Sequence, residues 1–288
     1  MASPAHTVRS KPASATALKL DRNTLLLLLL QWLVFAGNVT AAIRDPLPAW
    51  LHVAIGILPV HVAFTIWHEA AHGTVSNRRW INNAVGILGM FPYMTPYFIQ
   101  RAVHLDHHKY LNEPGRDPNE IYAGGPFWQL PLRYLRLFAH ARRAVADDPR
   151  TRAMRISDYA SLAVVASAYG VMIWQGWWLA LFCAWLLPFA IAKVVMDWYI
   201  NYLPHVGLPP DRFKGTRIID VRWLTPLILF HNYHAIHHLW PTIPWHAYLA
   251  RYRDRLAYLK QNGVPIEARV FVARAGGAAS EPAGRTGG

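Results

Sequence analysis

The segment Asn232–Pro241 reads Asn-Tyr-His-Ala-Ile-His-His-Leu-Trp-Pro and carries three histidines within five positions. On a helix, His234, His237 and His238 occupy positions i, i+3 and i+4, so their imidazoles are expected to share one face. Similar local clusters occur three more times along the chain: the triplet His104, His107 and His108, the pair His68 and His72, and the pair Asn201 and His205.

The composition indicates a membrane protein. Of the 288 residues, 53% are hydrophobic and only 16% are charged, whereas soluble domains carry about a quarter charged residues. The single cysteine, Cys183, excludes internal disulfides, iron–sulfur clusters and Cys-x-x-Cys zinc sites. A formal net charge of +13 could indicate a nucleic-acid partner, but no nucleic-acid-binding module is recognisable and we expect no such partner.

Four apolar segments are predicted to span a membrane: residues 24–43, 47–67, 157–174 and 177–196. A helix of about twenty residues is long enough, because at about 1.5 Å per residue it crosses a hydrocarbon core of about 30 Å. Residues 81–99 are apolar but broken by Pro92 and Pro96, so an interfacial or re-entrant segment is predicted there. Residues 131–155 have an arginine-rich amphipathic pattern that is typical of a helix lying on a lipid surface.

The distribution of positive charge predicts the topology. With four spans, the N-terminus, residues 68–156 and everything after Met196 face the same side of the membrane. All of the 29 lysines and arginines except Arg44 and Lys193 then lie on this side, which marks it as cytoplasmic. The histidine clusters lie there too, so they can converge. We expect a multi-pass protein, in a bacterial inner membrane, with both termini and the metal site in the cytoplasm.

Nine of the fifteen histidines belong to the four clusters, and clustered imidazoles are typical ligands of transition metals. One ion cannot use nine of them, since zinc takes four ligands and octahedral metals take six. Two ions fit the number. A pair of redox metals where a membrane bundle ends indicates oxygen activation against an apolar substrate that enters from the lipid.

The three histidine motifs resemble the histidine boxes of the membrane fatty-acid desaturase and hydroxylase superfamily, and the resemblance extends over residues 24–252, including the order of boxes and spans. It implies a non-haem di-iron centre that uses O₂ and two electrons. In acyl-CoA desaturases, a motif similar to Asn201-x-x-x-His205 supplies a further histidine ligand and an asparagine that acts through a water. The resemblance therefore implies the following set of iron ligands: His68, His72, His104, His107, His108, His205, His234, His237, His238 and, through water, Asn201.

Two segments are most similar to the carotenoid β-ring hydroxylase branch of this superfamily, namely residues 232–245 and residues 112–118. This resemblance implies hydroxylation of the ring of a β-carotene-type substrate. The His-His-Leu-x-Pro-x-Ile-Pro pattern also occurs in acyl desaturases, so desaturation of a fatty acyl chain is the alternative. The sequence carries no flavin, haem or iron–sulfur motif, so electrons are expected from a separate acidic carrier, such as ferredoxin with its reductase, that docks on the basic face.

Other polar residues near the motifs have two interpretations. Asp197 could hold a ligand imidazole through its other ring nitrogen, or it could form an ion pair with Lys193 one helical turn earlier. His231 precedes the last triplet by three residues and is a candidate tenth ligand. His61 is expected to be a hydrogen-bonded core histidine rather than part of a substrate tunnel.

Two other classes of function remain open. His68-Glu69-Ala70-Ala71-His72 is also an H-E-x-x-H motif, in which the Glu would be the general base of a zinc metalloprotease. That interpretation leaves both triplets unexplained. A metal store or transporter is the third interpretation, but the clusters lie beyond the predicted spans, whereas a transported ion needs polar residues within them.

The predicted fold is an all-α integral membrane protein, with four transmembrane helices and a cytoplasmic helical cap that holds a histidine-rich di-metal site. The membrane desaturase/hydroxylase domain is assigned to residues 18–272. Residues 1–17 and 273–288 are poor in large apolar side chains and are expected to be disordered tails.

Overall fold

The computed structural model describes residues 17–44, 47–123, 126–133 and 152–270. The terminal tails and most of the surface helix expected at 131–155 therefore lie outside the described residues. The described part is mostly helical, as predicted. It also contains one short parallel pair of strands, β1 (Ile218–Ile219) and β2 (Ile266–Glu267), in which Ile218 pairs with Ile266.

Four helices of the described part are long and apolar enough to cross a membrane. They confirm the four predicted spans, with shifted ends. The first three are α1 (Arg22–Arg44), α2 (Ala49–His72) and α7 (Arg152–Trp174). The fourth is a continuous helical stretch built from α8 (Trp178–Leu181), a π-helical segment (Phe182–Leu186), α9 (Leu187–Met196) and a second π-helical segment (Asp197–Tyr202).

Helix α2 is the centre of the bundle and packs against α1, α3 (Arg79–Met90) and α9. Its last turns are deeply buried, and they include Ile66 and Trp67. Helices α1 and α7 bury far less of their surface and keep large apolar side chains, such as Leu33 and Ile173, exposed. An exposed apolar helix surface is what lipid contact requires. Because exposed and buried spans are both apolar, the sequence alone does not distinguish α1 and α7 from the buried helix α2.

Polar side chains join the spans inside the bundle. Asn38 of α1 donates a hydrogen bond from Nδ2 to the carbonyl oxygen of His52 in α2, and its Oδ1 lies 2.9 Å from Nδ1 of the same histidine. Gln31 donates from Nε2 to the carbonyl oxygens of Pro59 and Gly89. Such interhelical hydrogen bonds hold membrane helices together where the hydrophobic effect between them is absent.

The apolar segment 81–99 forms no continuous spanning helix, as expected. Helix α3 has twelve residues, about 18 Å at 1.5 Å per residue, which is too short to cross. A turn over residues 91–96 follows, and α4 (Tyr97–Lys109) then leads away from it. Met94 in this turn has a positive φ of 56°, which is uncommon for a residue other than glycine.

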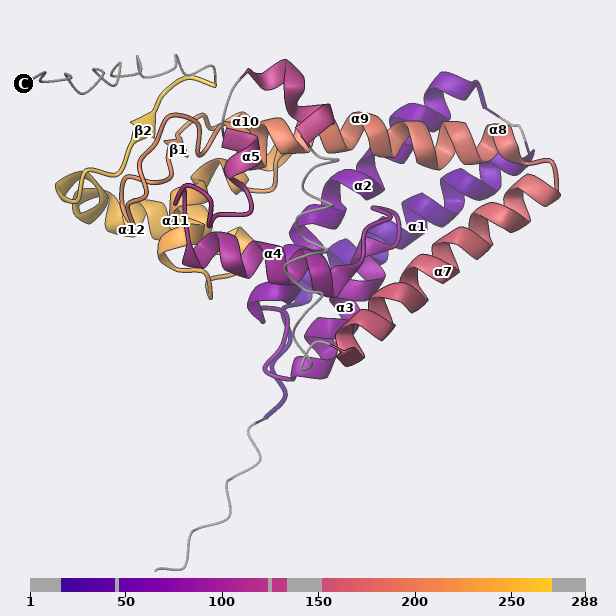
Figure 1. The fold of residues 1–288 in the computed structure, drawn as a ribbon, viewed down its shortest axis with the longest axis horizontal. Coiled ribbons are helices and arrows are strands. Elements are labelled where there is room, and N and C mark those ends of the chain that lie inside the picture. The colour runs from indigo at the N-terminus through magenta and orange to yellow at the C-terminus, as the bar shows by residue number, and fades with distance from the viewer. Residues whose placement is uncertain (1–16, 45–46, 124–125, 134–151, 271–288) are drawn as a thin grey trace, which may run out of the picture.

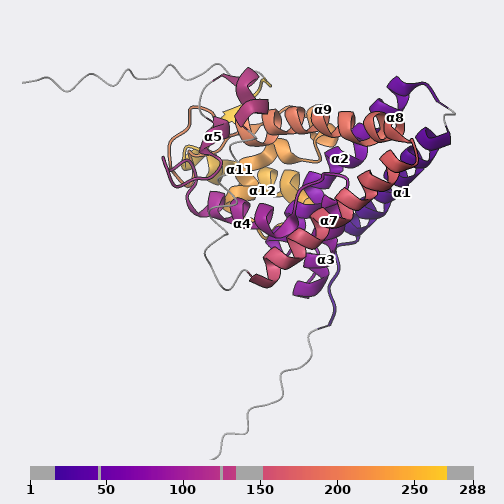
Figure 2. The same cartoon turned by 45° about the vertical axis from the view of Figure 1, so that its right-hand side comes forward.

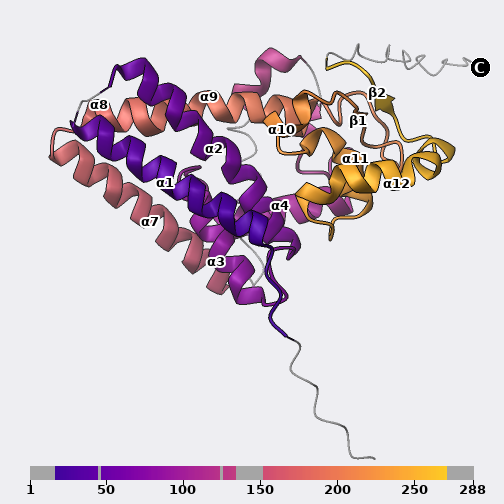
Figure 3. The ribbon, with the colours of Figure 1, turned by 180° about the vertical axis from the view of Figure 1, so that it is seen from behind.

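The remaining short elements form a cap beyond one end of the bundle, opposite the connection between α7 and α8 (Figures 1 and 3). They are α5 (Glu120–Ala123), a 3₁₀ turn (Phe127–Gln129), α10 (Leu224–Leu227), a 3₁₀ turn (His231–Tyr233), α11 (His234–Leu239), a 3₁₀ turn (Trp245–Ala247) and α12 (Tyr248–Gln261). The cap has a core of its own, in which Ile218, Tyr233, Ile236, Tyr248 and Leu259 are fully buried. This core holds α11 in place against α12.

Candidate metal centre

The histidine motifs lie where the spans meet the cap. His68 and His72 occupy the last turns of α2, which ends at Gly73 with a positive φ of 72°. The first triplet lies in the C-terminal half of α4, and the second triplet supplies three of the six residues of the short helix α11. His205 follows the second π-helical segment. Helices α4 and α11 both approach the end of the bundle that carries the cap in Figure 2.

Nine histidines form two compact groups, in each of which the potential ligand nitrogens lie within 4.8 Å of one another. The first group is His68, His72, His104, His108 and His237. The second group is His107, His205, His234 and His238. These are the nine histidines selected from sequence, and each can bind a metal ion through one ring nitrogen.

The nitrogen–nitrogen distances fit shared ligation of an ion. In the first group, Nε2 of His68 lies 2.9 Å from Nε2 of His237, and Nε2 of His72 lies 2.8 Å from Nε2 of His104. In the second group, Nε2 of His238 lies 3.0 Å from Nε2 of His234, one turn earlier in α11. Two nitrogens bound to one ion at about 2.1 Å and at right angles lie about 3.0 Å apart. The donor set therefore fits two transition-metal ions.

Burial and the neighbouring imidazoles lower the pKa of six of these histidines well below the usual value of about 6.5. They are His104, His108, His205, His234, His237 and His238. A neutral imidazole keeps a lone pair, which is the form that binds metal. The centre is therefore prepared for a metal ion and not for an anion.

The structure divides each triplet between the two groups, which corrects the expectation that a triplet points its rings in one direction. In α11, His237 joins the first group while His234 and His238 join the second. In α4, His107 belongs to the second group and its two triplet neighbours to the first. Each triplet thus bridges the groups. Positions i and i+3 differ by about 60° around a helix axis, so a helix inserted between two sites can serve both.

A carboxylate orients His107. Nδ1 of this histidine lies 2.9 Å from both side-chain oxygens of Asp117, and both residues are buried. Asp117 also accepts hydrogen bonds from the backbone N–H groups of Asn112 and Asn119. A hydrogen bond at Nδ1 fixes the tautomer and leaves Nε2 free for a metal. Sequence reasoning missed this residue, although it lies in the segment 112–118 that had been singled out.

A second set of hydrogen bonds begins at Glu69. Nδ1 of His237 lies 3.1 Å from the Tyr248 hydroxyl, which in turn lies 3.4 Å from Oε1 of Glu69. The same carboxylate oxygen lies 3.4 Å from Nδ1 of His68, and the other one accepts a 2.6 Å hydrogen bond from Thr74. Glu69 therefore supports His237 through Tyr248 and lies beside His68, whose Nδ1 has no hydrogen-bond partner among the described residues. Tyr248 had no sequence signal, because it lies eleven residues from the histidine it contacts.

The other polar residues singled out from sequence have defined partners. Asp197 forms the ion pair with Lys193 and accepts a 3.0 Å hydrogen bond from Nδ2 of Asn201, so its contacts match the ion-pair interpretation. A cavity of about 20 Å³ is lined by Asn201, Asp197 and His104, among other residues. That volume holds one water molecule. Asn201 thus lies where a water could connect it to the centre.

Two further histidines lie beside the metal groups but outside them. Nε2 of His231 lies 2.9 Å from the Thr65 hydroxyl, and burial lowers its pKa to about 3. His61 contacts the Tyr199 hydroxyl at 3.0 Å and the carbonyl oxygen of Leu227 at 2.9 Å. The structure brings neither within a described metal group, and His61 is hydrogen-bonded as expected.

Replacing Asp117 by Asn should weaken metal binding at the second group about 10- to 100-fold, because the amide no longer fixes the tautomer of His107. Iron content after dialysis against graded chelator measures this change. Glu113→Gln is the matched control, since its carboxylate lies in the same loop and forms an exposed ion pair with Arg116. Equal metal retention in the two variants would contradict the orienting role of Asp117.

The metal-free protein should lose stability as the pH falls below about 6.5. In the unfolded chain the histidines bind protons with ordinary pKa values of about 6.5, whereas the buried native imidazoles stay neutral, so the unfolded state binds more protons and gains stability. Thermal unfolding in detergent with chelator, from pH of about 8 to about 5, measures the effect. The unfolding midpoint should be constant above about pH 7.5 and fall below that pH. A midpoint that stays constant over the whole range would contradict the claim that burial keeps the native imidazoles neutral.

Comparison with known proteins places this centre in a family. A sequence model described as fatty acid desaturase matches residues 45–269, which is most of the chain and includes every residue of the two histidine groups.

Individual relatives are distant. The chain is 29% identical over 231 residues to a beta-carotene ketolase of Paracoccus sp. (strain PC1), covering 76% of this chain and 86% of that protein. It is 27% identical over 203 residues to the beta-carotene ketolase of Paracoccus sp. (strain N81106), covering 68% and 72%. It is 26% identical over 235 residues to an sn-1 oleoyl-lipid 12-desaturase of Picosynechococcus sp., covering 69% of this chain and 65% of that enzyme. The chain therefore belongs to the fatty acid desaturase family and is an oxidoreductase of that family.

Proposed function

We propose that this chain is a membrane-bound non-haem di-iron enzyme that uses O₂ and two electrons to oxidise an unactivated C–H bond of a lipid. The observation that carries the proposal is the pair of adjacent groups of histidines at the cap end of four membrane-length helices. Oxidation of an apolar lipid needs both features. The helices give access to a substrate in the bilayer, and the imidazoles can hold a redox metal.

The two groups of histidines would hold one iron each, and Asn201 would complete the set through a water in the adjoining cavity. When bound there, the two irons together with O₂ and an external electron source supply the oxidising power. The residues that hold the metals are also the catalytic centre. Among the described residues, no other cluster of potential metal ligands lies beside them.

The residues of the chain position the metals and limit the access of water. Asp117 fixes the ring of His107, and Glu69 acts through Tyr248 on His237. Fixed rings need no reorganisation when the redox state changes. Three members of the groups are only half-buried, namely His72, His108 and His238. The centre is therefore more open on the side of these residues than elsewhere.

For the substrate we propose a carotenoid of the β-carotene type that is hydroxylated on its ring. The sequence similarities over residues 232–245 and 112–118 support this choice, and two of the relatives named above are beta-carotene ketolases. Ring hydroxylation and ketone formation both begin with oxidation of a ring C–H bond. Fatty acyl desaturation is the alternative, supported by the relative named as an oleoyl-lipid desaturase.

The environment of Glu69 argues against a zinc metalloprotease. A general base in such an enzyme must be able to reach a metal-bound water. Glu69 is buried and directs its carboxylate toward Thr74, Tyr248 and Nδ1 of His68. Nδ1 is the nitrogen on the opposite side of the ring from Nε2, the atom that contacts His237. Glu69 is thus better suited to orienting ligands than to attacking a peptide.

We further propose that the metal centre and both termini face the cytoplasm, with the chain in a bacterial inner membrane. The basis is the asymmetric distribution of lysine and arginine around the four spans. Among the described residues, Arg253, Arg255 and Lys260 are exposed on α12 of the cap. The same helix packs against α11, so a partner docked on it would lie close to the histidines.

An acidic electron carrier such as ferredoxin, with its reductase, fits this basic surface. Turnover driven by reduced ferredoxin should therefore fall several-fold when the salt concentration rises from about 0.05 M to about 0.5 M. Turnover driven by dithionite is the control and should change little, because no protein has to dock. If both rates respond alike, or neither responds, the docking hypothesis is wrong.

Product analysis tests the proposed reaction. The chain is produced, together with a ferredoxin system, in a bacterium that accumulates β-carotene, and total lipid extracts are compared by mass spectrometry. A carotenoid that gains one or two oxygens is the expected result. His107→Ala should abolish the product, because it removes a ligand of the second group. His246→Ala should retain it, since this histidine contacts Asp21 and belongs to neither group.

The other outcomes are equally informative. Unchanged carotene with acyl chains that have lost two hydrogens would identify an acyl desaturase. Purified protein that binds two irons but changes neither pool would contradict both substrate proposals. Product formation that persists in His107→Ala would contradict the role of the metal centre itself.

A further inference from the structure

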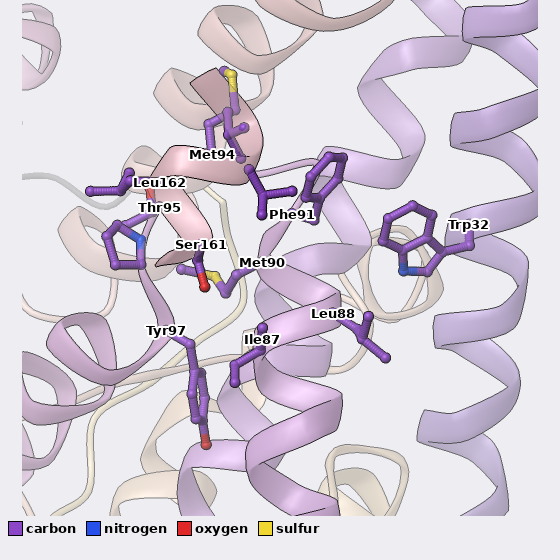
Figure 4. A pocket seen from close by; sticks show the side chains of 13 residues that line it. Trp32, Ile87, Leu88, Met90, Phe91, Met94, Thr95, Tyr97, Ser161 and Leu162 are labelled. Carbon is purple, nitrogen blue, oxygen red and sulfur yellow. The ribbon is translucent and has the colours of Figure 1, made fainter. Parts of the chain in front are cut away.

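An apolar cavity of about 410 Å³ lies between α1, α3, α7 and the turn over residues 91–96. Figure 4 shows the side chains of Trp32, Phe91, Met94 and Leu162 around it. Aromatic rings and flexible methionines make a lining that adapts to an apolar ligand of irregular shape. The volume is in the range of small-molecule binding sites.

The cavity opens sideways, toward the region that lipid would occupy. Its rim includes Leu88 and Val164, which are 49% and 57% exposed, whereas Met90 and Tyr97 at its base are almost fully buried. Helices α1 and α7 run side by side along it in Figures 1 and 2, and both carry exposed apolar side chains elsewhere. A ligand dissolved in the bilayer can therefore enter it without crossing water.

The same turn separates this cavity from the metal centre. Tyr93 of the turn lines the small inner cavity together with His104 and Asn201, and the next residue, Met94, lines the outer cavity. Helix α4 begins at Tyr97, which also lines the outer cavity, and reaches His104 seven residues later. Seven residues of helix are about 10 Å, so a long molecule in the cavity would lie close to the irons.

The two hydroxyl-bearing side chains Ser161 and Thr95 of the lining are hydrogen-bonded within the chain, whereas the indole N–H of Trp32 and the phenol of Tyr97 have no hydrogen-bond partner among the described residues. Ser161 donates to the carbonyl oxygen of Ser157, and Thr95 donates to that of Tyr93. No lysine, arginine or acidic residue is among the described residues of the lining. A phosphate or other charged headgroup would lose its hydration there without compensation. The site therefore suits a hydrocarbon segment and not a charged headgroup.

We propose that this lateral cavity is the site where the hydrocarbon chain of the substrate enters from the bilayer and is held, with the turn over residues 91–96 as the partition next to the irons. Its occupant is the conjugated chain of a carotenoid of the β-carotene type. Such a molecule is apolar along this chain and at both of its end rings. This inference rests on the proposed function. The half-buried side of the metal centre then remains accessible to O₂ and the electron donor.

Leu162→Trp tests the proposal by filling the cavity. Iron-loaded wild-type protein and variants are placed in lipid nanodiscs with β-carotene, without a source of electrons so that no turnover occurs, and examined by circular dichroism in the visible absorption band. A carotenoid held in a chiral site gives an induced signal, whereas one dissolved in lipid gives none. We expect the signal in the wild type and its loss in the variant. Ile173→Trp is the control on the same helix, since Ile173 is 59% exposed and does not line the cavity.

Kinetics of the iron-loaded enzyme give a second measurement. Leu162→Trp should raise KM for the carotenoid about tenfold or more with little change in kcat, because binding is lost and the reacting centre is intact. Ser161→Phe fills the cavity from the adjacent position and serves if the first variant does not fold. The thermal unfolding midpoint of each variant is compared with that of the wild type to exclude a general loss of structure.

The outcomes separate the site from the reaction. Absence of an induced signal in the wild type, or an unchanged signal in a folded cavity-filling variant, overturns the assignment of the cavity. A signal that disappears in Leu162→Trp but persists in Ile173→Trp supports it, even if no oxygenated carotenoid is found. In that case the carotenoid site stands and the proposed hydroxylation fails.

Discussion

The structure depends on the close contact of imidazoles, most of which are buried. Nine rings from the ends of two helices, the helix α11 and one loop form two groups whose potential ligand nitrogens lie within 4.8 Å of one another, and seven of the rings come within hydrogen-bonding distance of another ring. Neutral rings at these distances cannot all pair with one another, because each offers a single N–H. An unsatisfied buried polar group costs about 1–3 kcal/mol. The arrangement is therefore unfavourable by itself and would be relieved by metal ions that accept the free lone pairs.

Two different kinds of packing hold the rings at that point. The bundle positions His68 and His72 through the deeply buried end of α2, next to Trp67. The cap positions its own histidines through a separate apolar core, and α12 supplies the hydroxyl of Tyr248. Both parts are needed, because each metal group combines rings from more than one element. The centre thus joins the membrane bundle to the cap, and loss of the metal would remove that connection.

Much of the architecture could be predicted because it depends on local sequence. A span is determined by its length and apolar composition, so all four appeared in the predicted places and differed only at their ends. The nine histidines were recognisable because ligand spacing on a helix follows its period. The division of each triplet between two groups was not recognisable. Ring direction depends on the position of the helix between its neighbours, which no local pattern describes.

The sequence by itself determined which histidines can bind metal, how many helices can cross a membrane, and that both lie near one another along the chain. Only the tertiary structure decided that His107 shares a site with His205, that Asp117 and Tyr248 orient the rings, and that an apolar cavity adjoins the turn at 91–96. The physical reason is range. Hydropathy and helical period act over a few residues, whereas these contacts join elements that packing alone brings together.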